Sequence, residues 1–97
     1  MPTIDDIRNN IRPFIDEYGI KKVGVFGSYA RGQAEESSDI DLLFDFQKKF
    51  GIFSLSHLKL CLEERLGKNV DILEFSSIDP AIRDNVLKDT VVIYEQR

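Results

Sequence analysis

Apolar residues recur at intervals of three or four between positions 4 and 18, which is the spacing of an amphipathic helix. Thr3 stands where an N-cap is expected, and Asp6 follows three residues later as its capping-box partner. Pro13 falls inside the repeat, so we expect the helix to kink or divide there. Gly19 is expected to end it. The chain therefore opens with an interrupted helix.

Four short apolar runs predict strands, at residues 21–26, 39–46, 69–75 and 90–94. In the second run the even-numbered residues are all apolar and the odd-numbered ones include three aspartates. Successive strand residues point to opposite faces, so the two sets separate. In the third run, Asp71 stands between Val70 and Ile72 and therefore faces away from these two core residues.

Helices are predicted between the strands. Leucines form one stripe from Ser54 to Leu66, Gly67 is expected to stop that helix, and residues 48–53 before it are expected to be a loop. Asp79 and Pro80 predict the N-cap and first residue of a helix that reaches about Lys88. Residues 28–32 are expected to form a short helix or turn, and residues 33–38 a polar loop.

This order predicts an α/β (α+β) fold with a small mixed sheet of about four strands and helices packed on one face. The 97 residues are expected to form one domain, 1–97. A net charge of −4 gives little attraction for nucleic acid, so no direct nucleic-acid partner is expected. No apolar stretch approaches a membrane span, and the first residues lack a signal-peptide pattern. We therefore expect a cytoplasmic protein with no membrane partner.

Asp39 and Asp41 are two positions apart on a predicted strand, so their carboxylates point to the same side. Two neighbouring carboxylates repel each other, and a divalent cation relieves that repulsion. Mg²⁺ takes one or two carboxylates and fills its other positions with water and substrate phosphate. The motif is common, however, and two solvated carboxylates at a strand start are the more frequent explanation of it alone.

Asp71 adds a third carboxylate within an apolar run. If the second and third strands are neighbours, Asp71 lies beside Asp39 and Asp41, and three aspartates can hold two metal ions for an in-line phosphoryl displacement. Asp71 could then also accept the proton of the attacking hydroxyl. Taken alone, an aspartate such as Asp71 is more often a solvent-facing strand residue.

Gly27 and Ser28 follow the first predicted strand and suit a phosphate, because glycine allows close approach of the backbone and the serine hydroxyl donates a hydrogen bond. As a pair they are also an ordinary turn. Arg31 could reach a phosphate or pair with a nearby carboxylate. Ser38 could contact a phosphate or cap its own loop.

Together, the run Gly27 to Gly32 and the run Ser38 to Leu43, with the later Asp71, resemble the DNA polymerase beta-like nucleotidyltransferase superfamily and its minimal (MNT) branch. The resemblance covers nearly the whole chain. It implies that Gly27 and Ser28 hold a nucleoside triphosphate, that Asp39 and Asp41 coordinate Mg²⁺, and that Asp71 is the third acid. It also implies transfer of a nucleoside monophosphate to a hydroxyl with release of pyrophosphate.

Minimal members are commonly antitoxins paired with HEPN-domain toxins, which are RNases, and some transfer AMP from ATP to a toxin tyrosine. The resemblance thus implies an antitoxin that binds ATP and two Mg²⁺ ions and forms a hetero-oligomer with a HEPN toxin. Two alternatives remain open: an antitoxin that neutralises by binding alone, and a nucleotidyltransferase acting on a small-molecule hydroxyl.

Overall fold

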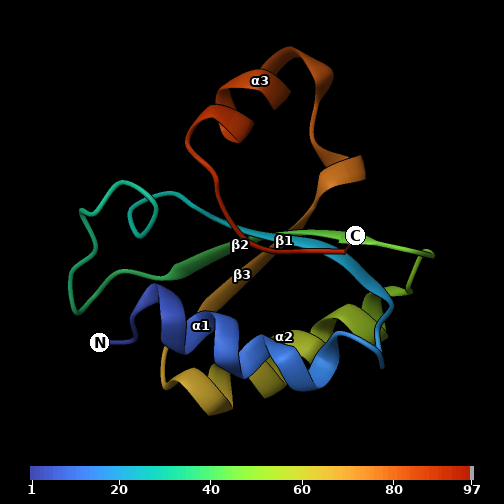
Figure 1. Ribbon diagram of the computed structural model, residues 1–97, viewed down its shortest axis with the longest axis horizontal. Helices are drawn as coiled ribbons and strands as arrows, with labels where there is room; N and C mark the ends of the chain where they lie inside the picture. The colour runs from blue at the N-terminus through green and yellow to red at the C-terminus, as the bar shows by residue number, and fades with distance from the viewer. Residues whose placement is uncertain (97) are drawn as a thin grey trace.

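A four-stranded mixed sheet in the order β3-β2-β1-β4 forms the middle of the molecule (Figure 1). The computed structural model describes residues 1–96. β2 pairs with β1 in antiparallel and with β3 in parallel orientation, and β4 pairs antiparallel with β1. The elements follow along the chain as α1 (Ile4–Ile11), the 3-10 helix η1 (Arg12–Phe14), β1 (Ile20–Phe26), β2 (Ile40–Phe46), α2 (Ile52–Leu66), β3 (Val70–Glu74), the 3-10 helix η2 (Phe75–Ser77), α3 (Pro80–Lys88) and β4 (Val91–Glu95).

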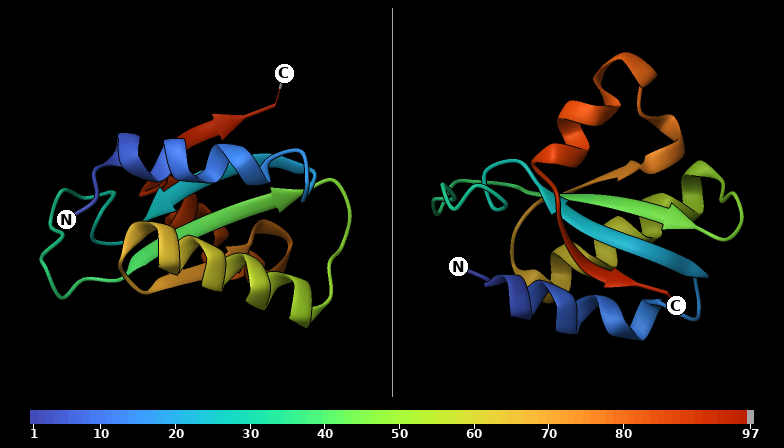
Figure 2. Two further views of the ribbon diagram at one scale, coloured as in Figure 1. Left: turned by 90° about the horizontal axis from the view of Figure 1, so that it is seen from below. Right: turned by 45° about the horizontal axis from the view of Figure 1, so that its top comes forward.

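The core lies between the sheet and a layer formed by α1 and α2. Figure 2 shows these two helices side by side across one face of the sheet. The even-numbered apolar residues of β2 point into this layer, as their alternation predicts. Completely buried side chains come from both helices and three strands: Ile7, Ile11, Ile20, Val23, Val25, Ile40, Leu42, Phe44, Leu58, Leu62 and Val70.

The third helix, α3, lies over the opposite face of the sheet (Figure 1). It belongs to the connection from one edge strand, β3, to the other edge strand, β4, and so crosses the face that α1 and α2 leave open. No residue of α3 is buried. The expectation that helices pack on one face therefore holds for α1 and α2, whereas α3 stands on the side to which the odd-numbered residues of β2 point.

Most predicted boundaries agree with the structure within one or two residues. The first helix does divide near Pro13, where α1 passes into η1. The prediction of a loop over residues 48–53 was wrong at its end, because α2 begins at Ile52. Ile52 and Phe53 are 75% and 88% exposed, so this first turn carries none of the buried stripe that marks the rest of α2.

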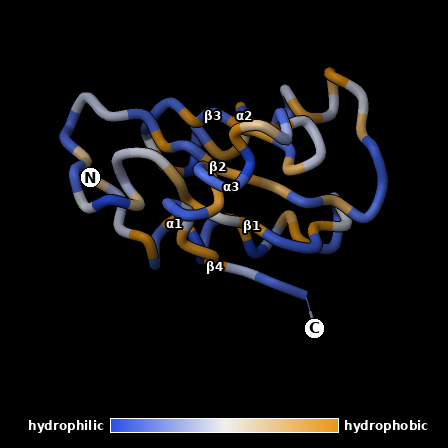
Figure 3. The backbone as a smooth tube through the Cα atoms, turned by 90° about the horizontal axis from the view of Figure 1, so that it is seen from above, coloured by the Kyte–Doolittle hydropathy of each residue, from blue (hydrophilic) through white to orange (hydrophobic). Residues whose placement is uncertain are grey.

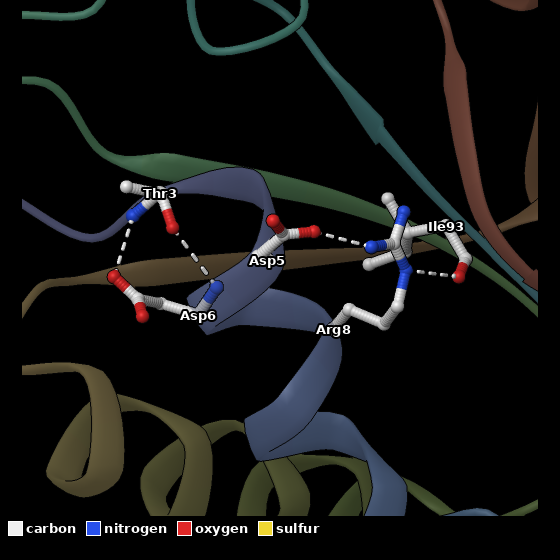
Figure 4. A network of polar contacts seen from close by, with 5 residues as sticks. All are labelled: Thr3, Asp5, Asp6, Arg8 and Ile93. Atoms are coloured by element: carbon white, nitrogen blue, oxygen red, sulfur yellow. Dashed lines mark hydrogen bonds and ion pairs between the residues drawn. The ribbon is translucent and has the colours of Figure 1, made fainter.

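A capping box closes the N-terminus of α1 (Figure 4). The Asp6 backbone N–H donates to the Thr3 hydroxyl at 3.1 Å, and the Thr3 backbone N–H donates to the Asp6 carboxylate at 2.9 Å. These two bonds satisfy donors that a helix start otherwise leaves open. Accepting from the Thr3 backbone N–H keeps the pKa of Asp6 below its ordinary value.

Replacing Thr3 with alanine is expected to reduce the free energy of unfolding by about 1 kcal/mol, because the side-chain acceptor of the cap is lost. Thr3→Ser retains the hydroxyl and should stay close to the wild type. Urea unfolding followed by circular dichroism measures both variants. An unchanged midpoint in Thr3→Ala would show that the cap does not stabilise the native fold.

Hydropathy along the backbone agrees with this architecture. β4 passes from hydrophobic to hydrophilic toward the C-terminus (Figure 3), as the sequence from Val91 to Gln96 indicates. None of the helices within residues 1–96 has the length and apolar character needed to cross a bilayer.

Candidate active site

Gly27 follows the last residue of β1 and turns the chain into the segment that leads to β2. Its φ of 72° lies in the left-handed region, which glycine adopts without the penalty that a Cβ brings. A Cβ at this position would overlap Oδ2 of Asp41. The backbone of the predicted phosphate turn is therefore in direct contact with a predicted metal ligand. Only glycine fits between them without a shift of that carboxylate.

Asp41 and Asp71 stand opposite each other on the parallel strands β2 and β3. Asp39 lies immediately before β2, where the backbone N–H of Ile40 donates to the carbonyl of Asn69 at 3.0 Å. Because β2 and β3 are parallel, both begin at the same end of the sheet, and their first carboxylates lie together at that end. The sequence predicted that Asp71 lies beside Asp39 and Asp41 if the second and third strands are neighbours. In the structure these strands, β2 and β3, are paired.

The electrostatics of Asp41 reflect this crowding. Its pKa is raised from the ordinary value, first by partial burial and then by the carboxylates of Asp71 and Asp39, while the Arg31 guanidinium acts in the opposite direction. The charged form of Asp41 is thus disfavoured in the protein alone. A cation placed among the carboxylates would remove the repulsion between them.

These residues fit Mg²⁺ in the chemistry of their donors, which are carboxylate oxygens only. No three His, Cys, Asp or Glu side chains between residues 1 and 96 already form a complete metal-binding cluster. Mg²⁺ usually takes only one or two carboxylates and completes its shell with water and phosphate oxygens. The arrangement at Asp41 therefore suits a magnesium ion that arrives with a phosphorylated ligand.

The turn after Gly27 offers further groups to an anion. The carbonyls of Gly27 and Ser28 accept from the N–H groups of Arg31 and Gln33, at 3.2 and 2.9 Å. The Ser28 backbone N–H, by contrast, has no partner among the described residues and is available to a phosphate oxygen. Arg31 is exposed, and its Nε donates to the Gln33 side chain at 3.1 Å.

Ser38 caps its own loop, which was one of the two roles that the sequence left open for it. Its hydroxyl accepts from the Glu35 N–H at 2.8 Å, and its N–H donates to the Glu35 carbonyl at 2.9 Å. Ser38 and Asp39 line an open hollow of about 450 Å³ together with Lys68 and Asn69. Gly27 and Arg31 border a different hollow, of about 300 Å³. The candidate nucleotide-binding residues thus border two separate hollows.

The sequence did not single out Lys68, which holds the loop before Asp39 in place. Its Nζ donates to the carbonyls of Glu36 and Glu35, at 2.6 and 3.3 Å, and lies 6.0 Å from the centre of the Tyr29 ring. Nothing in the local pattern marks this lysine, because its partners are more than 30 residues away along the chain.

Comparison with known proteins decides the family. The model of the family described as Polymerase beta, Nucleotidyltransferase matches residues 9–97. The chain belongs to this family. The match includes the Gly27 turn and all three aspartates, so the resemblance inferred from the sequence motifs is confirmed, and the protein is a nucleotidyltransferase.

Two relatives resemble this nucleotidyltransferase over most of their own length. "Putative protein adenylyltransferase MJ0435" of Methanocaldococcus jannaschii is 42% identical over 88 residues, which cover 91% of this chain and 95% of the relative. "Protein adenylyltransferase MntA" of Thermococcus cleftensis is 38% identical over 78 residues, covering 80% and 79%.

The fold of this nucleotidyltransferase also occurs in a solved complex. In a structure of tri-AMPylated HEPN toxin from Shewanella oneidensis with MNT antitoxin, one chain matches 97% of this chain with a TM-score of 0.74, over 74% of its own length. The identity is 17%, so this likeness shows the shared fold. The mixed four-stranded sheet expected from the sequence is confirmed by the strand pairing of this chain.

Proposed function

We propose that this nucleotidyltransferase is an antitoxin that transfers AMP from ATP to a hydroxyl, a tyrosine side chain, of a cognate HEPN-domain RNase toxin and thereby neutralises it. The observation that carries the proposal is the contact of Gly27 with Asp41, which itself stands opposite Asp71. A phosphate-binding turn, a metal ligand and a proton acceptor then adjoin one another at the ends of three neighbouring strands.

Each residue has a role in this scheme. The Ser28 N–H and hydroxyl, the Gly27 backbone and the Arg31 guanidinium hold the triphosphate, and Ser38 supports the loop that presents Asp39. Asp39, Asp41 and Asp71 hold Mg²⁺, two ions when ATP is bound. Mg²⁺ supplies positive charge that offsets the charge of the triphosphate and of the transition state.

The transfer forms a bond between the acceptor oxygen and the α-phosphorus and breaks the bond from that phosphorus to the oxygen bridging to the β-phosphate. Pyrophosphate leaves with the electron pair of the broken bond. Asp71 accepts the proton of the acceptor hydroxyl, a role that requires it to be ionised. Its place on β3 puts it at the far side of Asp41 from the Gly27 turn.

Two comparisons support a protein acceptor. One relative, 38% identical, is named a protein adenylyltransferase, and the fold occurs in a complex of an MNT antitoxin with an AMP-bearing HEPN toxin. We further propose that residues 1–97 form one nucleotidyltransferase domain acting in the cytoplasm in a hetero-oligomer with the toxin.

The proposal is tested by incubating the protein with Mg²⁺ and the HEPN protein encoded beside it, with ATP labelled either in the α- or in the γ-phosphate. Label from the α-phosphate is expected on the partner, and label from the γ-phosphate is expected in pyrophosphate. Chelation of Mg²⁺ should abolish the transfer, because the carboxylates of the site then lack their cation. Mass spectrometry of the partner identifies the modified residue.

Absence of α-label on a partner that binds would contradict the proposal. An antitoxin that neutralises by binding alone would still inhibit the toxin after Asp39→Asn and Asp41→Asn are combined, which an RNase assay of the toxin measures. A transferase acting on small molecules would instead turn over without the partner.

A further inference from the structure

A second hollow adjoins the proposed phosphate turn on the open face of the sheet. It has a volume of about 300 Å³, at the lower end of the range of small-molecule sites. One wall consists of Phe26, Gly27 and Arg31, at the end of β1 and in the turn that follows. Gly27 and Arg31 belong both to the proposed phosphate turn and to the wall of the hollow. A ligand held at the turn can therefore extend into the hollow along the same face of the sheet.

The other wall is one face of α3 and its C-cap residue. Ile82, Asn85, Val86 and Asp89 line it, and their spacing of three, four and seven positions places them on the same side of the helix. Ile82 is 52% exposed, although it lines the same hollow as Phe26 at the end of β1. The apolar residues of this face therefore do not fill a core, and they remain open to a ligand.

The polar residues of this wall also remain available. Neither the Asn85 amide nor the Asp89 carboxylate forms a hydrogen bond or ion pair with any described residue of the chain. The amide both donates and accepts, and the carboxylate accepts. A flat molecule with apolar faces and amino and ring-nitrogen groups on its edge would satisfy both parts of the wall, which is the chemistry of a purine base.

We propose that this hollow binds the base of the transferred nucleotide, with Phe26, Ile82 and Val86 against its faces and Asn85 and Asp89 on its edge. The inference rests on the proposed function, in which the Gly27 turn holds the triphosphate of the same molecule. The acceptor is placed elsewhere by the strand order. Asp71, the proposed proton acceptor, is on β3, whereas the hollow lies at β1, on the other side of β2.

The test measures the dissociation constants of Mg–ATP and of Mg–tripolyphosphate, which lacks sugar and base, by isothermal titration calorimetry. Ile82→Trp narrows the hollow, and Ala81→Trp puts the same side chain at the adjacent exposed position of α3, outside the hollow. We expect Ile82→Trp to weaken ATP binding about tenfold. Tripolyphosphate binding should stay within about twofold, a change of less than 0.5 kcal/mol. Ala81→Trp should change neither.

A second pair of variants tests the edge of the base. Asn85→Ala should weaken ATP binding about fivefold through loss of one or two hydrogen bonds. Asp84→Ala, one position away and outside the hollow, should leave ATP binding unchanged. Thermal melting checks that all four variants are folded.

Unchanged ATP affinity in Ile82→Trp, or equal weakening of ATP and tripolyphosphate, overturns the assignment of the base. If ATP affinity is unchanged while AMP transfer to the partner falls, the hollow serves the acceptor and the assignment is also wrong. These results would leave the proposed function standing, whereas a wild-type protein that neither binds Mg–ATP nor transfers AMP would contradict both.

Discussion

Replacing Asp41 with asparagine is expected to lower AMP transfer at least about a hundredfold, the usual effect of removing one group that stabilises charge in a transition state. Asp41 adjoins both the Gly27 turn and Asp71, so no other carboxylate can take its place without moving a strand. Transfer of α-label to the partner measures the loss. Asp45→Asn, on the same strand and the same face, is the matched control and should retain activity.

The same substitution should stabilise the metal-free fold. The raised pKa of Asp41 means that folding disfavours its charged form. Its contribution to stability is therefore fully present below the pKa of the unfolded chain and is lost as the pH rises through the higher pKa of the folded state. Asparagine carries no charge at any pH, so in EDTA the melting temperature of Asp41→Asn should exceed that of the wild type at neutral pH.

Addition of Mg²⁺ with ATP should then raise the melting temperature of the wild type more than that of the variant, because binding to the native state alone stabilises it. A variant that is less stable than the wild type in EDTA at neutral pH would contradict the repulsion inferred at Asp41. Equal stabilisation of both proteins by Mg–ATP would contradict its role as a metal ligand.

Gly27→Ala is expected to reduce both stability and transfer. An alanine in the left-handed conformation costs roughly 1–2 kcal/mol. At this position its Cβ would also overlap Asp41 Oδ2, so the carboxylate must move or the turn must open. A displacement of about an ångström in a catalytic group can cost about a hundredfold in rate. Urea unfolding and the α-label assay measure the two effects.

Gly32→Ala separates the free-energy cost of the left-handed backbone conformation from the effect of steric overlap with Asp41. Gly32 has nearly the same φ, 70° against 72°, but no atom lies within 4 Å of the position its Cβ would take. This variant should lose a similar free energy of unfolding and keep its transfer activity close to that of the wild type. If both glycine variants lose activity alike, close packing of Gly27 on Asp41 does not explain the requirement for glycine.

Local patterns were sufficient for most elements of the fold. Period-2 alternation identified β2 and its core-facing residues, and Gly67, with a φ of 69°, ended α2 as predicted. The start of α2 was missed because Ile52 and Phe53 are exposed and outside the buried stripe on which the prediction relied. The position of α3 could not be predicted either, since its short pattern shows which residues share a face but not which side of the sheet that face covers.

The sequence by itself determined which residues are candidates for the chemistry: the Gly27–Ser28 turn, the Asp39–Asp41 pair and Asp71 on a separate strand. Only the tertiary structure decided that Asp71 stands opposite Asp41, that Asp41 lies against Gly27, and that α3 forms a wall beside the turn. The physical reason is the separation along the sequence over which a local pattern is informative. Side-chain periodicity reports neighbours a few positions apart, whereas strand order and helix placement depend on burial between segments that are much farther apart along the chain.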